Sequence, residues 1–175
     1  MTTPLTASIQ QSLAANKFYP PRINTSQSID RHSIIADRTG KDLFAGRIII
    51  VEAQAGQGKT TLVYQYLEHT EAPYIWYQIG TEDSDPVVLL GALNQAFSRK
   101  FNNFTSPQLE AILDSGQIGP MDLQGCANIL LNDIDTALDS DMFLVLDDLH
   151  LVGEAQLTNQ LLDYLIDTSP PTLHY

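Results

Sequence analysis

The 175 residues suffice for one domain with a hydrophobic core, since 43% of them are hydrophobic and 17% are charged. The formal net charge is -12, and with only nine Lys and Arg residues the chain itself is not expected to bind DNA or RNA. A single cysteine, Cys126, excludes a disulfide framework and a cysteine-based zinc site. The sequence has no apolar run of membrane-spanning length and no signal peptide, so we expect a cytoplasmic protein without membrane contacts.

Two regions are expected along the chain. Residues 1–28 are polar and rich in turn-forming residues, including Pro20-Pro21, and are predicted to be an extended lead-in outside the core. Residues 29–175 are predicted to form one domain, which begins with a short helix over residues 29–43. Three sparse positive charges lie in the first 31 residues of this acidic chain: Lys17, Arg22 and Arg31. Arg31 is either a surface residue or a contact to the base or phosphates of a ligand.

The most informative segment is residues 47–61, with the sequence RIIIVEAQAGQGKTT. Residues 48–51 are a continuous apolar run, as expected of a buried parallel strand, and residues 53–58 form a turn of small residues. Lys59 then opens a predicted helix in which apolar residues keep helical spacing: Leu62, Val63, Tyr66 and Leu67. This order of strand, loop and helix is typical of a phosphate-binding loop.

Each residue type in this loop has a chemical reason. Gly56 and Gly58 let the backbone curl so that its N–H groups point at phosphate oxygens, and the start of the helix adds partial positive charge. Lys59 supplies a positive charge near the β- and γ-phosphates, and Thr60 supplies a hydroxyl for Mg²⁺. We therefore expect a nucleotide, ATP or ADP, to bind at Ala53, Gln54, Ala55, Gly56, Gln57, Gly58, Lys59, Thr60 and Thr61. The alternative is a glycine-rich turn without a ligand.

Strands and helices are predicted to alternate after this loop. Strands are expected at residues 74–79 and 142–146, which are short apolar runs with aromatic and β-branched residues. Asp85-Pro86 is a typical helix start, and a polar connection containing Pro107 is expected to follow that helix. Three helices are predicted from apolar residues at helical spacing: Leu89, Leu93 and Phe97; Leu123, Ala127, Leu130, Ile134 and Leu138; Leu157, Leu161 and Leu165. The alternation predicts an α/β fold with a mostly parallel sheet.

The strand at residues 142–146 is followed by two aspartates, Asp147 and Asp148. Ligands bind at the carboxyl ends of parallel strands, so these carboxylates should meet the phosphate loop at one edge of the sheet. We expect Asp147 to hold Mg²⁺ together with Thr60, directly or through water. Asp148 is expected to orient the attacking water, and Lys59 completes the predicted catalytic residues. The alternative is that the two carboxylates are solvated strand caps.

Other polar and aromatic residues near this edge have structural interpretations. Asp85 is expected to cap a helix, and residues 81–84 are expected to form a solvated turn. His150 is interpreted as a partly exposed loop residue. Trp76 and Tyr77 are expected to be core or interface residues and not a platform for adenine.

With both motifs in view, the chain resembles the nucleotide-binding domain of the MalT-like, LuxR-type regulators, a branch of the signal-transduction ATPases with numerous domains. The resemblance rests on residues 53–62 (AQAGQGKTTL), 76–86 (WYQIGTEDSDP) and 144–151 (LVLDDLHL). Residues 21–35 are also similar to the family's lead-in. The resemblance implies a three-layer P-loop NTPase fold, incomplete at its C-terminus because a strand central to the sheet would begin near residue 171.

The resemblance also implies a regulatory switch. In this family ATP with Mg²⁺ favours an active, self-associating state, and ADP favours a resting state. Contacts with DNA are made only by C-terminal domains, which are expected to lie beyond this chain, so the chain is expected to be the front of a longer protein. Two alternatives remain: an enzyme such as a nucleotide kinase or motor-type ATPase, and a degenerate scaffold that no longer hydrolyses nucleotide.

Overall fold

The computed structural model describes residues 15–23 and 46–175, so the predicted helix at residues 29–43 and Arg31 lie outside the described residues. Within this part of the chain, three parallel strands form one sheet in the order β1-β2-β3. Their bounds are β1 Tyr74–Gln78, β2 Met142–Asp147 and β3 Leu173–His174. β1 and β2 confirm the two predicted strands, and the mixed architecture confirms the α/β class.

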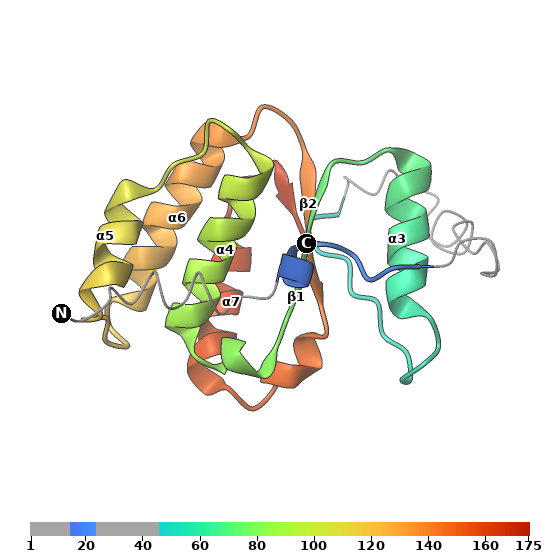
Figure 1. Ribbon diagram of the computed structural model, residues 1–175, viewed down its shortest axis with the longest axis horizontal. Coiled ribbons are helices and arrows are strands. Elements are labelled where there is room, and N and C mark those ends of the chain that lie inside the picture. Colours follow the sequence, from blue (N-terminus) through green and yellow to red (C-terminus); the bar gives the residue numbers. More distant parts are fainter. Residues whose placement is uncertain (1–14, 24–45) are drawn as a thin grey trace.

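Helices lie on both faces of this sheet (Figure 1). On one side is α3 (Lys59–Thr70), and on the other are α4 (Pro86–Lys100), α5 (Pro107–Ser115), α6 (Leu123–Ala137) and α7 (Gln156–Thr168). Three short 3-10 helices complete the described part: η1 (Ala15–Phe18), η3 (Thr81–Ser84) and η4 (Leu149–Val152). None of the described helices has the length and apolar character needed to cross a membrane.

Alternating side chains of the strands fill two separate hydrophobic clusters. Ile75 and Tyr77 of β1, with Leu144 of β2, belong to one cluster with buried residues of the four helices α4–α7. Trp76 of β1 and Phe143 of β2 pack on the opposite face, against α3. Because both faces of the sheet are covered, the strands need apolar residues at successive positions, which explains the continuous apolar runs in the sequence.

The predicted start of α4 is confirmed in detail. The carboxylate of Asp85 accepts a hydrogen bond from the backbone N–H of Val87 at 2.9 Å, and Pro86 is the first helical residue. This arrangement satisfies a backbone donor that the helix leaves unpaired. The predicted apolar stripe of α4 is also buried: Leu89, Leu93 and Phe97.

The segment expected to be a polar connection instead contains the helix α5. It begins at Pro107 and ends before Gly116, which has a positive φ of 62°. Leu109 and Leu113, four residues apart, are its buried positions. A proline at the first position and a glycine after the last are normal helix boundaries, so the signal was present in the sequence. The last predicted helix is present as α7, but Leu157, one of its three expected apolar positions, is 41% exposed.

Residues 48–51 do not form the buried strand that their apolar run predicts. Ile48 is 48% exposed and Ile50 is 82% exposed, whereas Ile49 packs against the α3 side of the sheet. The segment still lies beside the sheet, because Tyr175 donates its N–H to the carbonyl of Arg47 at 2.9 Å and accepts from the N–H of Ile49 at 2.7 Å. These two bonds follow the pattern of parallel strands. This pairing involves the single residue Tyr175 and leaves the side chains of Ile48 and Ile50 exposed.

Part of the predicted lead-in belongs to the core. η1 lies beside β1 (Figure 1), and Phe18 is buried in the cluster that α4–α7 form with the sheet. Its ring contacts that of Tyr77, with 5.9 Å between the ring centres. The expectation that this part of the chain lies outside the core was therefore wrong at Phe18.

Candidate functional site

The loop between residue 53 and α3 contains two glycines with a left-handed backbone. Gly56 and Gly58 have φ values of 78° and 77°. No atom lies within 4 Å of where a Cβ would stand at either residue, so the left-handed backbone, not crowding, favours glycine here. Leu62 donates its N–H to the carbonyl of Gly58 at 2.9 Å, which starts the helical hydrogen bonding of α3. The loop thus presents the amino end of a helix to solvent.

Lys59 folds back over this loop. Its ammonium donates to the carbonyl of Ala53 at 2.9 Å and to the carbonyl of Gln54 at 3.3 Å. Both acceptors are neutral backbone groups at an exposed position. The positive charge therefore lies at the amino end of α3, where the helix dipole also favours an anion.

Thr60 and Asp147 join the loop to the sheet. The hydroxyl of Thr60 lies 3.2 Å and 3.1 Å from the two carboxylate oxygens of Asp147, across 87 residues of sequence. Asp147 ends β2, and Thr60 is the second residue of α3, so each side chain is placed by a regular element. The two motifs meet at the carboxyl edge of the sheet, as their order in the sequence predicts.

The environment of Asp147 suits a cation. Burial raises the pKa of its carboxyl above the ordinary range, and the neighbouring carboxylate of Asp148 raises it further, whereas the hydrogen bond from Thr60 lowers it. A bound cation would favour the ionised form. Neighbouring ligands of an octahedral Mg²⁺ stand about 2.9 Å apart, close to the Thr60–Asp147 separation, so this pair fits the ion.

A Mg²⁺ ion at this place would need further oxygen ligands. Among residues 15–23 and 46–175 there is no group of three or more His, Cys, Asp and Glu side chains able to hold a metal. Magnesium commonly uses one or two protein oxygens and completes its shell with water and phosphate oxygens. A site made of Thr60 and Asp147 is therefore one that a nucleotide would complete.

Asp148 has a hydrogen-bond partner on β1. Its backbone is left-handed, with φ 60°, and its N–H donates to a carboxylate oxygen of Asp147 at 3.0 Å. Gln78, at the end of β1, donates from Nε2 to Oδ2 of Asp148 at 3.3 Å. His150 is largely exposed, as expected, with its Nδ1 3.8 Å from the other oxygen of Asp148. Reasoning from the sequence assigned no role to Gln78, because its partner Asp148 follows another strand.

The turn after β1 holds a polar cluster, which we call the Lys17 cluster: the buried Lys17, Tyr77 and Asp83, and the half-exposed Glu82. The ammonium of Lys17 lies 2.7 Å from Oδ2 of Asp83 and 2.6 Å from Oε1 of Glu82. Tyr77 donates its hydroxyl to Oδ1 of Asp83 at 2.6 Å. Asp83 is fully buried, so the prediction of a solvated turn over residues 81–84 was wrong at this position.

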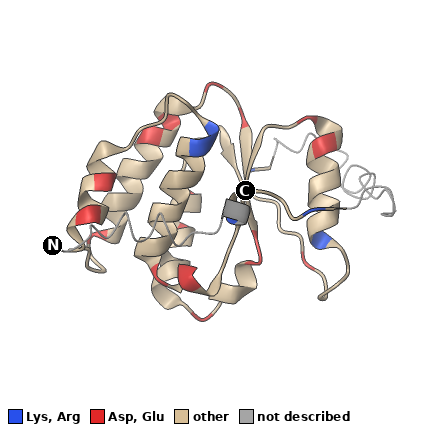
Figure 2. Cartoon of the chain, in the orientation of Figure 1, with Lys and Arg blue, Asp and Glu red and all other residues tan. Residues whose placement is uncertain are grey.

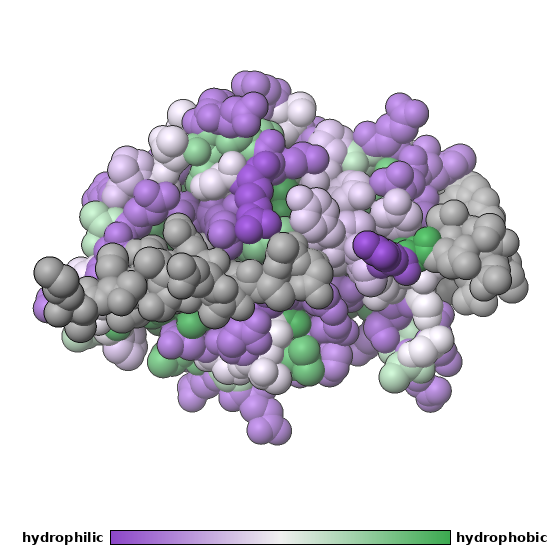
Figure 3. All heavy atoms as spheres, in the orientation of Figure 1, coloured by the Kyte–Doolittle hydropathy of each residue, from purple (hydrophilic) through white to green (hydrophobic). Residues whose placement is uncertain are grey.

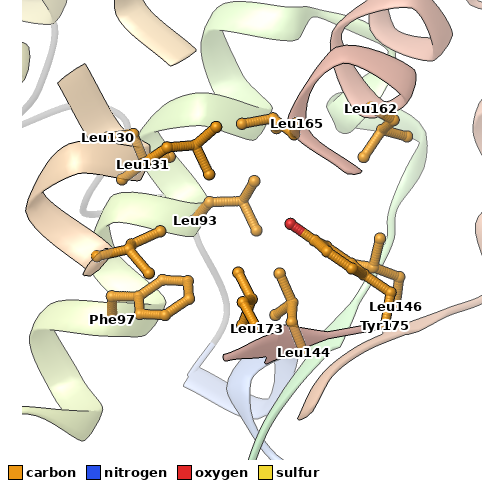
Figure 4. A pocket seen from close by; sticks show the side chains of 11 residues that line it. Leu93, Phe97, Leu130, Leu131, Leu144, Leu146, Leu162, Leu165, Leu173 and Tyr175 are labelled. Atoms are coloured by element: carbon orange, nitrogen blue, oxygen red, sulfur yellow. The ribbon is translucent and has the colours of Figure 1, made fainter. Parts of the chain in front are cut away.

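A small cavity lies elsewhere, between the sheet and the helices α4, α6 and α7 (Figure 4). Its volume is about 10 Å³, and its lining is almost entirely aliphatic and aromatic, including Leu93, Leu144 and Leu165. The hydroxyl of Tyr175 points toward its centre (Figure 4). A space of this size holds at most about one water molecule, so it is a packing defect of the core and not a nucleotide site.

The surface charge agrees with the composition. Asp and Glu residues are spread over the helices on both faces of the sheet, and Lys and Arg are few (Figure 2). On the face shown in Figure 3, hydrophilic residues dominate and hydrophobic ones form small patches. The electrostatic field of the acidic chain as a whole would repel a phosphate. Local groups of the loop would therefore have to attract it.

The structure thus brings Lys59, Thr60 and Asp147 to one edge of the sheet and places Asp148 beside Gln78. Trp76 and Tyr77 are buried in the core, as expected, and Asp85 is a helix cap. Comparisons of the chain with protein-family models and with curated proteins find no match.

Proposed function

We propose that this chain binds ATP or ADP with Mg²⁺ at residues 53–61 and Asp147. The contact between the Thr60 hydroxyl and the Asp147 carboxylate, at 3.1–3.2 Å, carries the proposal. These two groups come from separate motifs, and each motif by itself indicates a ligand of the same Mg²⁺ ion.

The roles of the residues follow from their positions. Backbone N–H groups of residues 55–60 and the amino end of α3 would hold the phosphates. Lys59 would exchange the carbonyls of Ala53 and Gln54 for phosphate oxygens, which are stronger acceptors because they are charged. Mg²⁺, when bound at Thr60 and Asp147, supplies charge neutralisation on the phosphates. Asp148 would orient the water that attacks the γ-phosphate.

We further propose that the nucleotide acts as a conformational switch in a regulator of the MalT-like, LuxR type with a P-loop NTPase fold. The similarity of residues 53–62, 76–86 and 144–151 to that family supports this. The parallel sheet with helices on both faces is compatible with it. Self-association in the ATP state and DNA contacts through further domains belong to the same proposal.

Binding of a fluorescent ATP analogue to wild type and to Lys59→Ala tests the nucleotide site. Loss of the ammonium is expected to weaken Mg-ATP binding at least about tenfold, equivalent to about 1.4 kcal/mol. Lys100→Ala, at the end of α4, is the matched control and should bind like wild type. Equal affinity of Lys59→Ala and wild type would contradict the site. If wild type showed neither binding nor a thermal shift with Mg-ATP or Mg-ADP, a degenerate scaffold would be the better interpretation.

A regulatory switch and an ordinary enzyme differ in turnover. Steady-state hydrolysis of ATP by wild type without any effector separates them. A slow rate is expected for a switch, whereas rapid multiple turnover, or transfer of phosphate to a small acceptor, would favour a motor-type ATPase or a kinase.

A further inference from the structure

Gln78 lies on the face of the sheet that carries the proposed nucleotide site. The cluster under α3 contains Tyr74 and Trp76 of β1, so the alternation of a strand places Gln78 on the same side. In the parallel register Gln78 stands opposite Asp147. The next residue, Ile79, donates its N–H to the carbonyl of Asp147 at 2.9 Å. The backbone of β1 therefore holds Gln78 beside the two aspartates.

The two adjacent carboxylates have different partners. Asp147 accepts the hydroxyl of Thr60, and Asp148 accepts Nε2 of Gln78 at 3.3 Å. Asp148 has a left-handed backbone, with φ 60°. Such a conformation is uncommon for a residue other than glycine and is maintained where surrounding contacts require it. Gln78 is one of those contacts.

The chemistry of an amide suits this position. An ionised carboxylate can only accept hydrogen bonds, so the nitrogen of the Gln78 amide faces Asp148. The amide is neutral and adds no third negative charge beside Asp147 and Asp148. A glutamate of the same size would repel both carboxylates, and a methionine would fill the space without a donor.

The end of β1 is itself fixed, which gives Gln78 a rigid base. Gly80 donates its N–H to Oδ2 of Asp83 at 2.7 Å, and Lys17 binds the same oxygen. Thr158 of α7 donates its hydroxyl to the carbonyl of Ser84 at 2.8 Å. Supporting contacts of this kind are what keep a functional side chain in one orientation.

We propose that Gln78 is a positioning residue for ATP hydrolysis, which holds the carboxylate of Asp148 in the orientation that aligns the attacking water. The proposal rests on the proposed nucleotide site. In that step the water oxygen forms a bond to the γ-phosphorus, and the bond from this phosphorus to the bridging oxygen breaks. The bonding electrons remain on ADP, and both protons of the water leave with the released phosphate as H₂PO₄⁻. Gln78 touches Asp148 and not the reacting atoms.

Single-turnover and steady-state hydrolysis by Gln78→Met tests this role on the full chain. The kcat is expected to fall about tenfold, while the Kd for Mg-ATP stays within about twofold of wild type. Gln108→Met, an exposed glutamine of α5, is the matched control and should keep both values. Gln78→Glu is a second variant of equal size, and its kcat should fall at least as far.

A double-mutant cycle with Asp148→Asn separates positioning from a general structural effect. If Gln78 acts through Asp148, Gln78→Met should change kcat by less than about twofold in the Asp148→Asn background. An equal loss in both backgrounds would overturn the proposal. So would wild-type kcat in both Gln78 variants, or the absence of any hydrolysis by a wild-type protein that binds Mg-ATP. If wild type and Lys59→Ala bound Mg-ATP equally, the nucleotide site itself would be wrong, which is a distinct result.

Discussion

Lys17 and Asp83 form a buried ion pair across 66 residues of sequence, with 2.7 Å between Nζ and Oδ2. The side chain of Lys17 is 8% exposed and that of Asp83 is fully buried. Tyr77 donates to the second oxygen of Asp83, so the buried carboxylate has partners on both sides. This pair ties η1 to the turn that follows β1, next to the candidate site.

Lys17→Met should destabilise the protein strongly. The substitution keeps the length of the side chain but leaves the buried carboxylate of Asp83 without its cation, a loss that typically costs about 3–5 kcal/mol. Urea unfolding followed by circular dichroism measures the change. Arg22→Met, an exposed cation four residues beyond η1, is the control and should change the free energy of unfolding by less than about 0.5 kcal/mol. Equal stability of the two variants would show that the ion pair contributes nothing.

Glu82 should contribute a pH-dependent part of the stability. Its hydrogen bond from Lys17 holds the pKa of the Glu82 carboxyl below its ordinary value of 4.5 in the folded protein. The contribution is therefore complete above pH 4.5 and is lost as the pH falls through the lower, folded-state pKa. Glu82→Gln should be less stable than wild type at neutral pH, with a difference that shrinks in acid.

The measurement for Glu82 is the free energy of unfolding of both proteins over a series of pH values. Glu154→Gln makes the same chemical change at an exposed position after η4 and serves as the control. A difference between wild type and Glu82→Gln that stays constant into acid would contradict the linkage with Lys17.

Thr60→Val should separate the binding of Mg²⁺ from the binding of phosphate. Valine has nearly the shape of threonine but lacks the hydroxyl that lies 3.1 Å from Asp147. The affinity for ATP with Mg²⁺ is expected to fall about tenfold, and the affinity with excess chelator should stay within about twofold. Isothermal titration calorimetry with and without Mg²⁺ gives both values. Thr136→Val on α6, where the hydroxyl bonds only a helix carbonyl, is the control. An equal loss with and without Mg²⁺ would argue against a metal ligand at Thr60.

Local signals in the sequence were sufficient for many elements. Asp85-Pro86 marked the start of α4, and the apolar runs marked β1 and β2, since capping and strand preference depend on neighbouring residues alone. The meeting of Thr60 with Asp147 also followed from the sequence, because the carboxyl ends of parallel strands lie at one edge.

Other features depended on partners distant in the chain. Residues 48–51 are apolar enough for a buried strand, yet Ile50 is exposed because burial depends on what covers the segment. In the sequence, Lys17 is one of several scattered positive charges. Only the fold brings its ammonium next to the carboxylate of Asp83. The neighbours of Gln78 in the sequence do not predict a chemical role for its side chain. Only the register with β2 places its amide beside Asp148.

The sequence by itself determined the α/β class of the fold and singled out residues 53–61, Asp147 and Asp148 as the candidates for a phosphate and metal site. These follow from residue types at fixed short spacing, which constrain the backbone and its charges locally. Only the tertiary structure decided which polar groups are buried and with which partners. The energy of a buried charge depends on the atoms around it, and those atoms come from η1, β1 and β2 together.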